Sequence, residues 1–497
     1  MARAGRWENR FMTVAAGLEG LFEVERGAAR AAVAAGAGKT FRGYDQGQSF
    51  LLPPSLDDWL DEDDEARFIS EVVEDLLDLT PIYASYASVS GAPPYDPRMM
   101  LKLLLFAYAT GVTSSRELER RCKRDIAFRW LSGNQAPDYR SLARFRRRHL
   151  DALPGLFLQV LRVCAEAGLV RLGRVALDGT KLAANASRHK AMSYDRIVPK
   201  IDQLQAEVNA LLAEAEAVDE AEDQAFGEDR RGDEIAPELA RREGRLAKLR
   251  AAKDAIEADT AEKAAAAARN KAETAGQSVE QADAAAAEAV DKAVPKAKAQ
   301  RNFTDPEARM MKTNRGFDYA FNAQAVVDEA HQIVLTAEVS QQATDVQQFV
   351  PMTEQTTRNL VAAGIGRSPE TVLADAGYCS EDNLEAAEDL AAQVLIATGR
   401  QRHGESFPAV GDTDPVPEGA SRRERMAHAL RTEQGRTGYA RRKAIVEPAF
   451  GQMKTRQNAG QLRLRGLAGA QGEWLLHTIC HNLRKLRSAT AAGLAPA

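Results

Sequence analysis

Cysteine is scarce in this sequence of 497 residues, and the four cysteines that occur are far apart. Cys122, Cys164, Cys379 and Cys480 are separated by 42, 215 and 101 positions, and no CxxC pair is present. This spacing excludes a zinc ribbon and a disulfide framework, because both need closely spaced cysteines. Few, isolated cysteines are typical of a protein in a reducing compartment.

Long apolar runs are also missing. A membrane-spanning helix needs about 20 mostly apolar residues, but the longest candidate, residues 99–112, is short and contains Lys102. The apolar stretch 11–18 is brief and runs directly into Glu19, so it does not predict a signal peptide. We therefore expect a cytoplasmic protein that does not contact a membrane.

The net charge is only −5, but the charges are distributed unevenly. Residues 98–150 carry 13 basic against 4 acidic residues, and residues 421–497 carry 15 against 4, whereas residues 196–300 carry 16 against 23. Basic segments with interleaved aromatic residues suit contact with a phosphate backbone. Solvated helix surfaces would explain the same charges, so charge alone leaves both interpretations open.

Hydrophobic periodicity predicts helices throughout residues 44–170. Residues 66–79 show helical spacing, and helix starts are expected at Asp96 and Asp138, where each aspartate lies next to a proline. Short helices with basic surfaces resemble a helix-turn-helix DNA-binding unit, and a helical bundle without a DNA role is the alternative. Residues 1–43 show no clear period and predict a poorly ordered extension.

Strands follow in a different pattern. Apolar and β-branched runs predict strands at residues 174–178, 319–327, 333–339, 371–375 and 392–398. Between the first two strands lies an Ala-rich, charged insertion, residues 196–300, in which apolar residues recur at helical intervals. We expect residues 200–295 to be mostly helix and, because of the acidic excess, mostly away from DNA. Residues 401–436 are polar and predict a loop.

Two of the predicted strands lead into an aspartate and then a glycine, at Asp178-Gly179 and at Asp375-Ala-Gly377. If these strands are parallel neighbours, their ends meet at one edge of the sheet and bring the carboxylates within a few ångströms of each other. Such a pair repels itself and is most easily explained by bound cations. Two cations could then clamp the attacking and leaving oxygens of a phosphodiester. A simple turn role for each aspartate is the alternative.

Several longer segments carry a more specific signal. They are YDQGQSFLLPPSLDDWL (44–60), LDGTKLAANASRHKAMSY (177–194), NFTDPEARMMKT (302–313), YAFNAQAVVD (319–328), LADAGYCS (373–380), VEPAFGQMK (446–454) and LRLRGLAGAQGEWLLHTICHNLRKL (462–486). In this order they resemble bacterial insertion-sequence DDE transposases of the insertion-sequence 1182 type. The likeness extends over about residues 41–487.

The resemblance implies an α/β ribonuclease-H-like catalytic domain, with a mixed five-stranded sheet and helices, over residues 171–487. A helical insertion at 196–300 interrupts it, an all-α DNA-binding domain at 44–170 precedes it, and a tail at 488–497 follows. The implied metal-binding and catalytic triad is Asp178, Asp375 and Glu447. Two Mg²⁺ ions, for which Mn²⁺ can substitute, are the implied cofactor.

The related Tyr-Arg-Glu-Lys signature supplies candidate DNA-binding residues. Tyr439, Arg442, Glu447 and Lys454 fit it, except that four residues instead of three separate Arg442 from Glu447. Lys443 has the signature's spacing and would share a helix face with Glu447, so both basic residues remain candidates. Pro448 is expected to break or kink this helix.

Three arginines of the first basic region, Arg144, Arg146 and Arg147, are further candidates for DNA contact. The resemblance implies a transposase that cuts DNA at the terminal inverted repeats of its element and joins the ends to target DNA. It further implies a homo-oligomer in the DNA complex, at the bacterial nucleoid. The alternatives are a nuclease without strand transfer and a catalytically inactive DNA-binding protein.

Overall fold

The computed structural model describes residues 55–86, 93–226, 237–313, 316–399, 409–411 and 414–493. The extension expected at residues 1–43 lies outside the described residues. Leu56–Ala497 form one compact unit. None of the described helices is long and apolar enough to cross a membrane.

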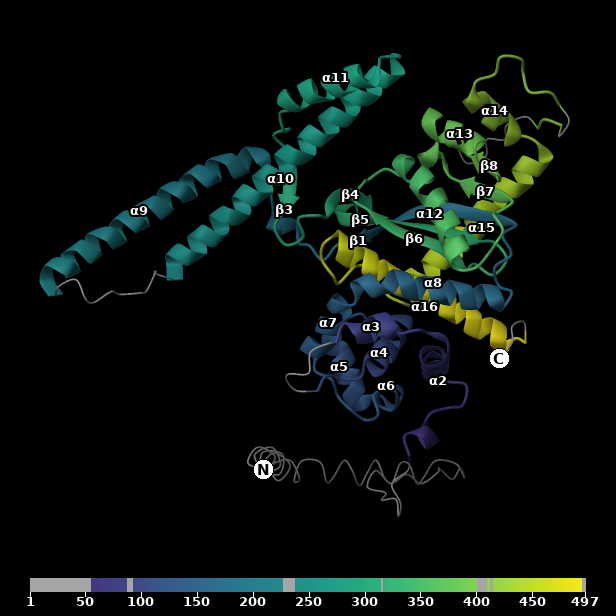
Figure 1. Cartoon of the computed structure of the whole chain (residues 1–497), viewed down its shortest axis with the longest axis horizontal. Coiled ribbons are helices and arrows are strands. Elements are labelled where there is room, and N and C mark those ends of the chain that lie inside the picture. Colours follow the sequence, from purple (N-terminus) through teal and green to yellow (C-terminus); the bar gives the residue numbers. More distant parts are fainter. Residues whose placement is uncertain are drawn as a thin grey trace, which may run out of the picture. The chain divides into compact units, whose positions relative to one another are not determined.

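Helices dominate the described residues between 55 and 166 (Figure 1). In chain order they are η1 (Asp57–Trp59), α2 (Glu65–Glu71), η2 (Val72–Leu76), α3 (Thr80–Ala84), α4 (Pro97–Ala109), α5 (Ser115–Arg124), α6 (Ile126–Leu131), α7 (Tyr139–Arg148), η3 (Leu150–Ala152) and α8 (Leu153–Glu166). Asp96 and Asp138 each accept a backbone N–H of the helix that follows, at 2.7 and 2.9 Å, and so cap α4 and α7. The two predicted helix starts are confirmed.

A mixed six-stranded sheet forms the second part of the unit. Its strands are β1 (Arg174–Ala183), β4 (Arg309–Thr313), β5 (Gly316–Asp328), β6 (Val334–Ser340), β7 (Thr371–Ala374) and β8 (Gln393–Ile396). Their order is β4-β5-β1-β7-β8, and β6 also pairs with β5. The pairs β1–β5, β4–β5 and β5–β6 are antiparallel, whereas β1–β7 and β7–β8 are parallel.

The sheet differs from the predicted one in two respects. The sequence predicts five strands, and the structure adds β4, whose Arg-Met-Met-Lys-Thr sequence contains only one β-branched residue and therefore gave no strand signal. The prediction that the first strand ends near Asp178 is also wrong. β1 continues to Ala183, because β5 pairs with it residue by residue as far as Ala183–Ala320.

The insertion is helical. The segment from residue 188 to residue 302 contains η4 (Arg188–Lys190), β2 (Ala191–Ser193), α9 (Tyr194–Phe226), α10 (Pro237–Thr274), α11 (Val279–Asp291) and β3 (Gln300–Asn302), with β2 and β3 paired (Figure 1). Helices α9 and α10 enclose a small apolar core of their own: Ile197, Leu204, Leu246, Leu249, Ala252 and Ile256. Among the described residues of 200–295 no strand occurs, so the predicted helical insertion is confirmed there.

The remaining elements are η5 (Val346–Gln348), α12 (Phe349–Ala362), η6 (Ala376–Tyr378), α13 (Glu381–Glu388), α14 (Arg422–Ala429), α15 (Glu433–Thr455) and α16 (Leu467–Ala491). The predicted loop at 401–436 is wrong in part, because α14 and the start of α15 fall within it. Polar helices of this kind carry little hydrophobic periodicity, and a capping box between Ser421 and Glu424 begins α14. The expected tail at 488–497 is shortened as well, because α16 reaches Ala491.

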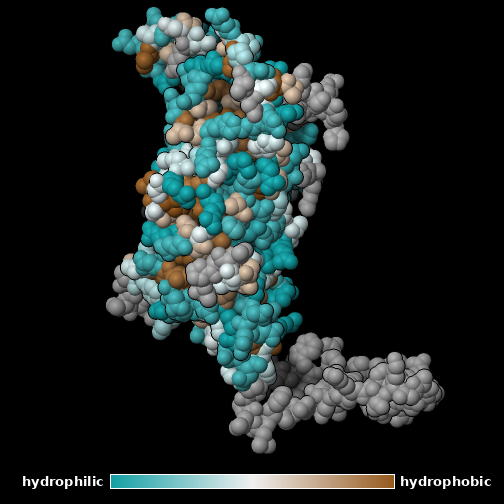
Figure 2. All heavy atoms as spheres, turned by 90° about the vertical axis from the view of Figure 1, so that its right-hand side faces the viewer, coloured by the Kyte–Doolittle hydropathy of each residue, from teal (hydrophilic) through white to brown (hydrophobic). Residues whose placement is uncertain are grey.

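One hydrophobic core joins the N-terminal helices to the sheet. Helix α16 packs against α4 and α8 on one side and against β6 and β5 on the other. On the face of the molecule that Figure 2 shows, hydrophilic residues predominate and hydrophobic residues form small separate groups. Among the described residues, the core has members both before and after residue 170, where the boundary between two domains was expected.

A buried polar network also crosses this boundary. It includes Arg146, which the sequence predicts to contact DNA, so that prediction is wrong. Arg146 is buried, and its guanidinium donates to the Tyr108 hydroxyl at 2.7 Å and to the Thr113 carbonyl at 3.0 Å. The Tyr108 hydroxyl donates in turn to Glu473 of α16 at 2.9 Å. Burial raises the pKa of Glu473, whereas the charge of Arg146 lowers it. Arg146 therefore faces the interior and is not available to DNA, whereas Arg147 is exposed.

Replacing Arg146 tests this network. Arg146→Ala leaves the buried Glu473 without its nearby positive charge, so we expect the free energy of unfolding to fall by about 3 kcal/mol. The exposed Arg147→Ala should change it by less than about 0.5 kcal/mol. Urea unfolding of both variants measures the difference, and equal stabilities would show that the network contributes nothing.

Candidate active site

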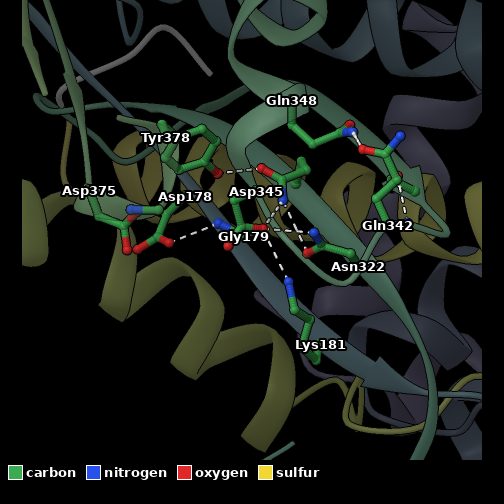
Figure 3. Close-up of polar contacts among 12 residues, drawn as sticks. Asp178, Gly179, Lys181, Asn322, Gln342, Asp345, Gln348, Asp375 and Tyr378 are labelled. Carbon is green, nitrogen blue, oxygen red and sulfur yellow. Dashed lines mark hydrogen bonds and ion pairs between the residues drawn. The ribbon is translucent and has the colours of Figure 1, made fainter. Parts of the chain in front are cut away.

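The register of two parallel strands brings Asp178 and Asp375 together. β1 pairs with β7 up to Leu177–Ala374, so the next residue of each strand is the aspartate. Figure 3 shows the two carboxyl groups beside each other. Asp375 follows the end of β7 and accepts the backbone N–H of Gly377 at 2.8 Å, which fixes its side chain over the turn η6. The expected parallel neighbourhood of the two strands is confirmed.

Arg442 of α15 lies against this pair. Its guanidinium donates to Asp178 Oδ2 at 2.7 Å, and both side chains are largely buried. The pKa of Asp178 is raised to about 6 in total: burial raises it most, the charge of Arg442 offsets part of that rise, and the charge of Asp375 adds to it. Two carboxylates and one guanidinium therefore share a poorly solvated space.

The other signature residues of α15 differ in their contacts with the site and in their exposure to solvent. Lys454 donates to the Thr180 hydroxyl of β1, and burial lowers the pKa of its amine. Tyr439 is half-buried beside Arg442, and burial raises the pKa of its phenol. Lys443 is exposed. Of the two basic candidates, Arg442 is therefore the one that the fold directs to Asp178.

Helix α15 is continuous through Pro448, contrary to the expected break. A proline inside a helix lacks the N–H that would bond the carbonyl four residues earlier, here that of Ala444. The Gln332 side chain donates to that carbonyl instead, at 3.2 Å. Arg442 and Lys454, on either side of Pro448, thus both reach β1 from one continuous helix.

Glu447 is placed differently from the two aspartates. It lies on α15 between Arg442 and Lys454, and it is exposed. Among the described residues no hydrogen bond or ion pair involves the side chain of Glu447, and no group of three or more His, Cys, Asp or Glu side chains is arranged to hold a metal ion. The fold thus brings together Asp178 and Asp375, two members of the implied triad. The third member, Glu447, lies on α15, two helical turns before Lys454.

A third aspartate, Asp345, lies on the opposite face of β1 and was missed from the sequence. Its Oδ1 accepts Lys181 Nζ at 3.1 Å, Asn322 Nδ2 at 2.7 Å and Gln324 Nε2 at 2.8 Å (Figure 3). In the sequence it stands in a polar segment just before a helix, where an aspartate ordinarily predicts a cap. The only available signal was its position between two strands that lead to the site.

The donor set of this site fits a hard divalent cation. Two carboxylates on adjacent strands offer the oxygen ligands that Mg²⁺ prefers, and their mutual repulsion within a buried space favours a bound positive charge. Asp178 and Asp375 are the residues that would hold it. Glu447 could join them only if its side chain turns toward β1.

Two parts of the chain match protein families. Residues 54–148 match a family described as "Transposase domain (DUF772)", and residues 291–483 match a family described as "Transposase DDE domain". The second range includes Asp375 and Glu447, whereas Asp178 lies between the two ranges. No match to the chain was found among curated proteins or among solved structures. Together the two family matches indicate an insertion-sequence transposase of the DDE type, and hence a role in transposition and DNA recombination.

The raised pKa of Asp178 predicts a pH effect on stability. Because its pKa rises from 3.8 to about 6 on folding, the folded protein holds this proton more tightly, so stability is greatest below the lower value and is lost as pH rises through 6. Without divalent cations, this loss should be at most about 3 kcal/mol between about pH 4 and pH 7.5.

Asp178→Asn should remove that contribution. Its free energy of unfolding should therefore decline less across this pH range than that of the wild type, in urea unfolding with a chelator present. The exposed Asp382→Asn is the matched control and should follow the wild-type curve. Parallel curves for wild type and Asp178→Asn would contradict the assigned burial of this carboxyl.

Proposed function

We propose that this transposase cuts DNA at the ends of its element and transfers the freed 3′-hydroxyl to target DNA, with two Mg²⁺ ions held at the site. The observation that supports the proposal is the Asp178–Asp375 pair, set on adjacent parallel strands beside Arg442 and Lys454. If bound there, divalent cations would neutralise charge on the phosphate and activate the attacking oxygen. No covalent enzyme intermediate is needed.

The residues around the pair have separate tasks in this proposal. Asp178 and Asp375 bind the cations, and Glu447 joins them when DNA is bound. Arg442 and Lys454 place two positive charges beside the carboxylates, where the phosphate to be cut must approach. Tyr439 lies against Arg442 and restricts the directions in which its guanidinium can turn.

We also propose a fold for the catalytic domain, a transposase subtype, the DNA ligand, the oligomeric state and the place of action. The mixed sheet, without the added strand β4, corresponds to a ribonuclease-H-like catalytic domain, and the segments quoted above favour the insertion-sequence 1182 type. At the element ends the protein binds the terminal inverted repeats, and it does so as a homo-oligomer. Because its substrate is the bacterial chromosome, the enzyme acts in the cytoplasm, at the nucleoid.

Helix α7 is the proposed contact for the element ends. Arg144 and Arg147 are exposed on it, and Arg140 stacks on the ring of Tyr139 at 5.7 Å from the ring centroid. Helix α5, which packs against α7, adds the exposed Arg120. Phosphate contacts of this kind fix the position of the duplex on the protein without reading its sequence.

Removing one carboxylate tests the catalytic assignment. Asp178→Asn and Asp375→Asn each keep the side-chain shape but lose a cation ligand, so cleavage of a duplex carrying the element end should fall by roughly 100-fold or more. Binding of the same duplex, measured by fluorescence anisotropy, should be unchanged or tighter. Asp382→Asn should cut at the wild-type rate, and wild-type cutting by either site variant would refute the assignment.

Glu447→Gln tests the third carboxylate separately. If Glu447 turns toward the pair when DNA binds, this variant should lose cleavage as Asp178→Asn does. A wild-type rate would show that two aspartates suffice.

The products of the wild-type reaction decide between the functions. Joined products support strand transfer, cut ends alone support a nuclease, and binding without either supports an inactive DNA-binding protein.

Neutralising the exposed arginines of α7 tests the binding surface. Arg144→Ala with Arg147→Ala should weaken binding of the element end and lower the slope of log K against log salt by about 2, because each lost phosphate contact releases about one counterion fewer. Lys292→Ala, an exposed position in the acidic insertion, is the control. Unchanged affinity and slope would assign these arginines to solvation.

A further inference from the structure

The segment between β6 and α12 lies against the face of β1 that is turned away from α15. Side chains alternate along a strand, so Asp178 and Thr180 point toward Arg442 and Lys454, whereas Gly179 and Lys181 point the opposite way. Residues 341–348 meet that second face through Asp345.

Asp345 is held to two strands at once. Its Oδ1 accepts hydrogen bonds from Lys181 of β1 and from Asn322 and Gln324 of β5. The register places Asn322 opposite Lys181 and Gln324 opposite Gly179, so all these groups share one face. Asn322 and Gln324 are fully buried. Although Asp345 precedes the short helix η5, its side chain does not cap that helix, so an ordinary capping role does not explain it.

The glycine beside Asp178 leaves the room that this contact needs. A Cβ at Gly179 would lie 2.7 Å from Asp345 Oδ1 and 2.3 Å from Gln324 Nε2. The backbone of Gly179 does not have a positive φ, so the requirement is one of space. Asp345 therefore packs directly against the backbone of the residue that follows Asp178.

The same segment also contacts the turn that carries Asp375. A Cβ at Gly377 would lie 3.5 Å from Asp345 Oδ2 and 2.9 Å from Asp375 Oδ1. The buried Tyr378 hydroxyl donates to Gln324, one of the partners of Asp345. Asn383 links the two segments further, because its amide donates to the carbonyls of Val346 at 2.6 Å and Tyr378 at 2.7 Å.

We propose that Asp345 is a positioning residue that sets the separation of Asp178 and Asp375 from the far side of the sheet. This inference rests on the proposed function, because the distance between the Asp178 and Asp375 carboxylates matters for a cation that both of them bind. Asp345 contacts the backbone next to Asp178 on one side and the turn after Asp375 on the other, while Lys181 balances its charge. It does not touch the cation or the DNA.

Asp345→Asn is the test, read through direct cation binding as well as activity. An amide can keep its oxygen toward Lys181, Asn322 and Gln324, but it loses the charge that faces Lys181 and puts an NH₂ group at the Oδ2 position beside Gly377, so we expect the turn after Asp375 to move. Mn²⁺ affinity, followed by electron paramagnetic resonance without DNA, should fall by about 10-fold, the range seen when groups behind metal ligands are changed. Cleavage should then need more Mn²⁺ and recover to within about 3-fold of the wild-type rate at saturation.

Other outcomes separate the possibilities. Asp382→Asn, the exposed control, should bind Mn²⁺ as the wild type does. A lower melting temperature of Asp345→Asn with unchanged Mn²⁺ affinity would reduce Asp345 to a structural role and overturn the inference. If the wild type itself shows no Mn²⁺ binding that Asp178→Asn abolishes, the proposed function fails as well, and the two failures are thereby distinguished.

A second variant covers the case in which Asp345→Asn does not fold. The double variant Lys181→Met, Asp345→Asn removes both charges of the ion pair and leaves no unpaired amine. It should show the same loss of Mn²⁺ affinity, because the contacts of Asp345 with the two glycine backbones are changed in both variants. Wild-type affinity in the double variant would overturn the inference.

Discussion

The parallel pairing of β1 with β7 is the constraint on which the rest of the site depends. Four residue pairs align the strands, and the last of them, Leu177–Ala374, makes Asp178 and Asp375 neighbours although 197 positions separate them in the chain. Parallel strands need a long crossover connection, and this chain uses it to carry β4, β5, β6 and α12 as well as the helical insertion. The antiparallel partner β5 continues to pair with β1 beyond the aspartate, so Thr180 and Lys181 lie on the two faces of an extended strand.

Charge balance at the sheet follows from that pairing. Two aspartates side by side in a poorly solvated space repel each other, and the fold provides a positive group on each face of β1. Arg442 compensates Asp178 on the α15 side, and Lys181 compensates Asp345 on the other side. Both pairs are largely buried, so the loss of hydration offsets much of their attraction and their net contribution to stability is small. Their larger effect is to define where the carboxyl groups point.

The N-terminal helices are fixed to this sheet rather than tethered to it. Helix α16 is shared by both parts, and the buried path from Arg146 through Tyr108 to Glu473 ends at the backbone N–H groups of Arg463 and Leu464, which Glu473 accepts at 2.7 and 2.8 Å. Those two residues lie between α15 and α16. A duplex held on α7 would therefore have a defined orientation relative to α15, which carries Arg442, because a close-packed protein core deforms very little.

Several features were determined by the sequence alone, because they depend on local chemistry: the helix starts at Asp96 and Asp138, the helical insertion, and the strand runs that lead to the two aspartates. Periodicity and capping act within a few residues and can be read directly. The tertiary structure decided what depends on partners distant in the chain. It directed Arg442 and not Lys443 to Asp178, because burial against β1 selects one face of α15. It buried Arg146 while Arg144 and Arg147 stayed exposed, and it kept α15 intact at Pro448 through Gln332. It also placed Asp345 behind the site, since only the β1–β5 register brings its three donors to one point.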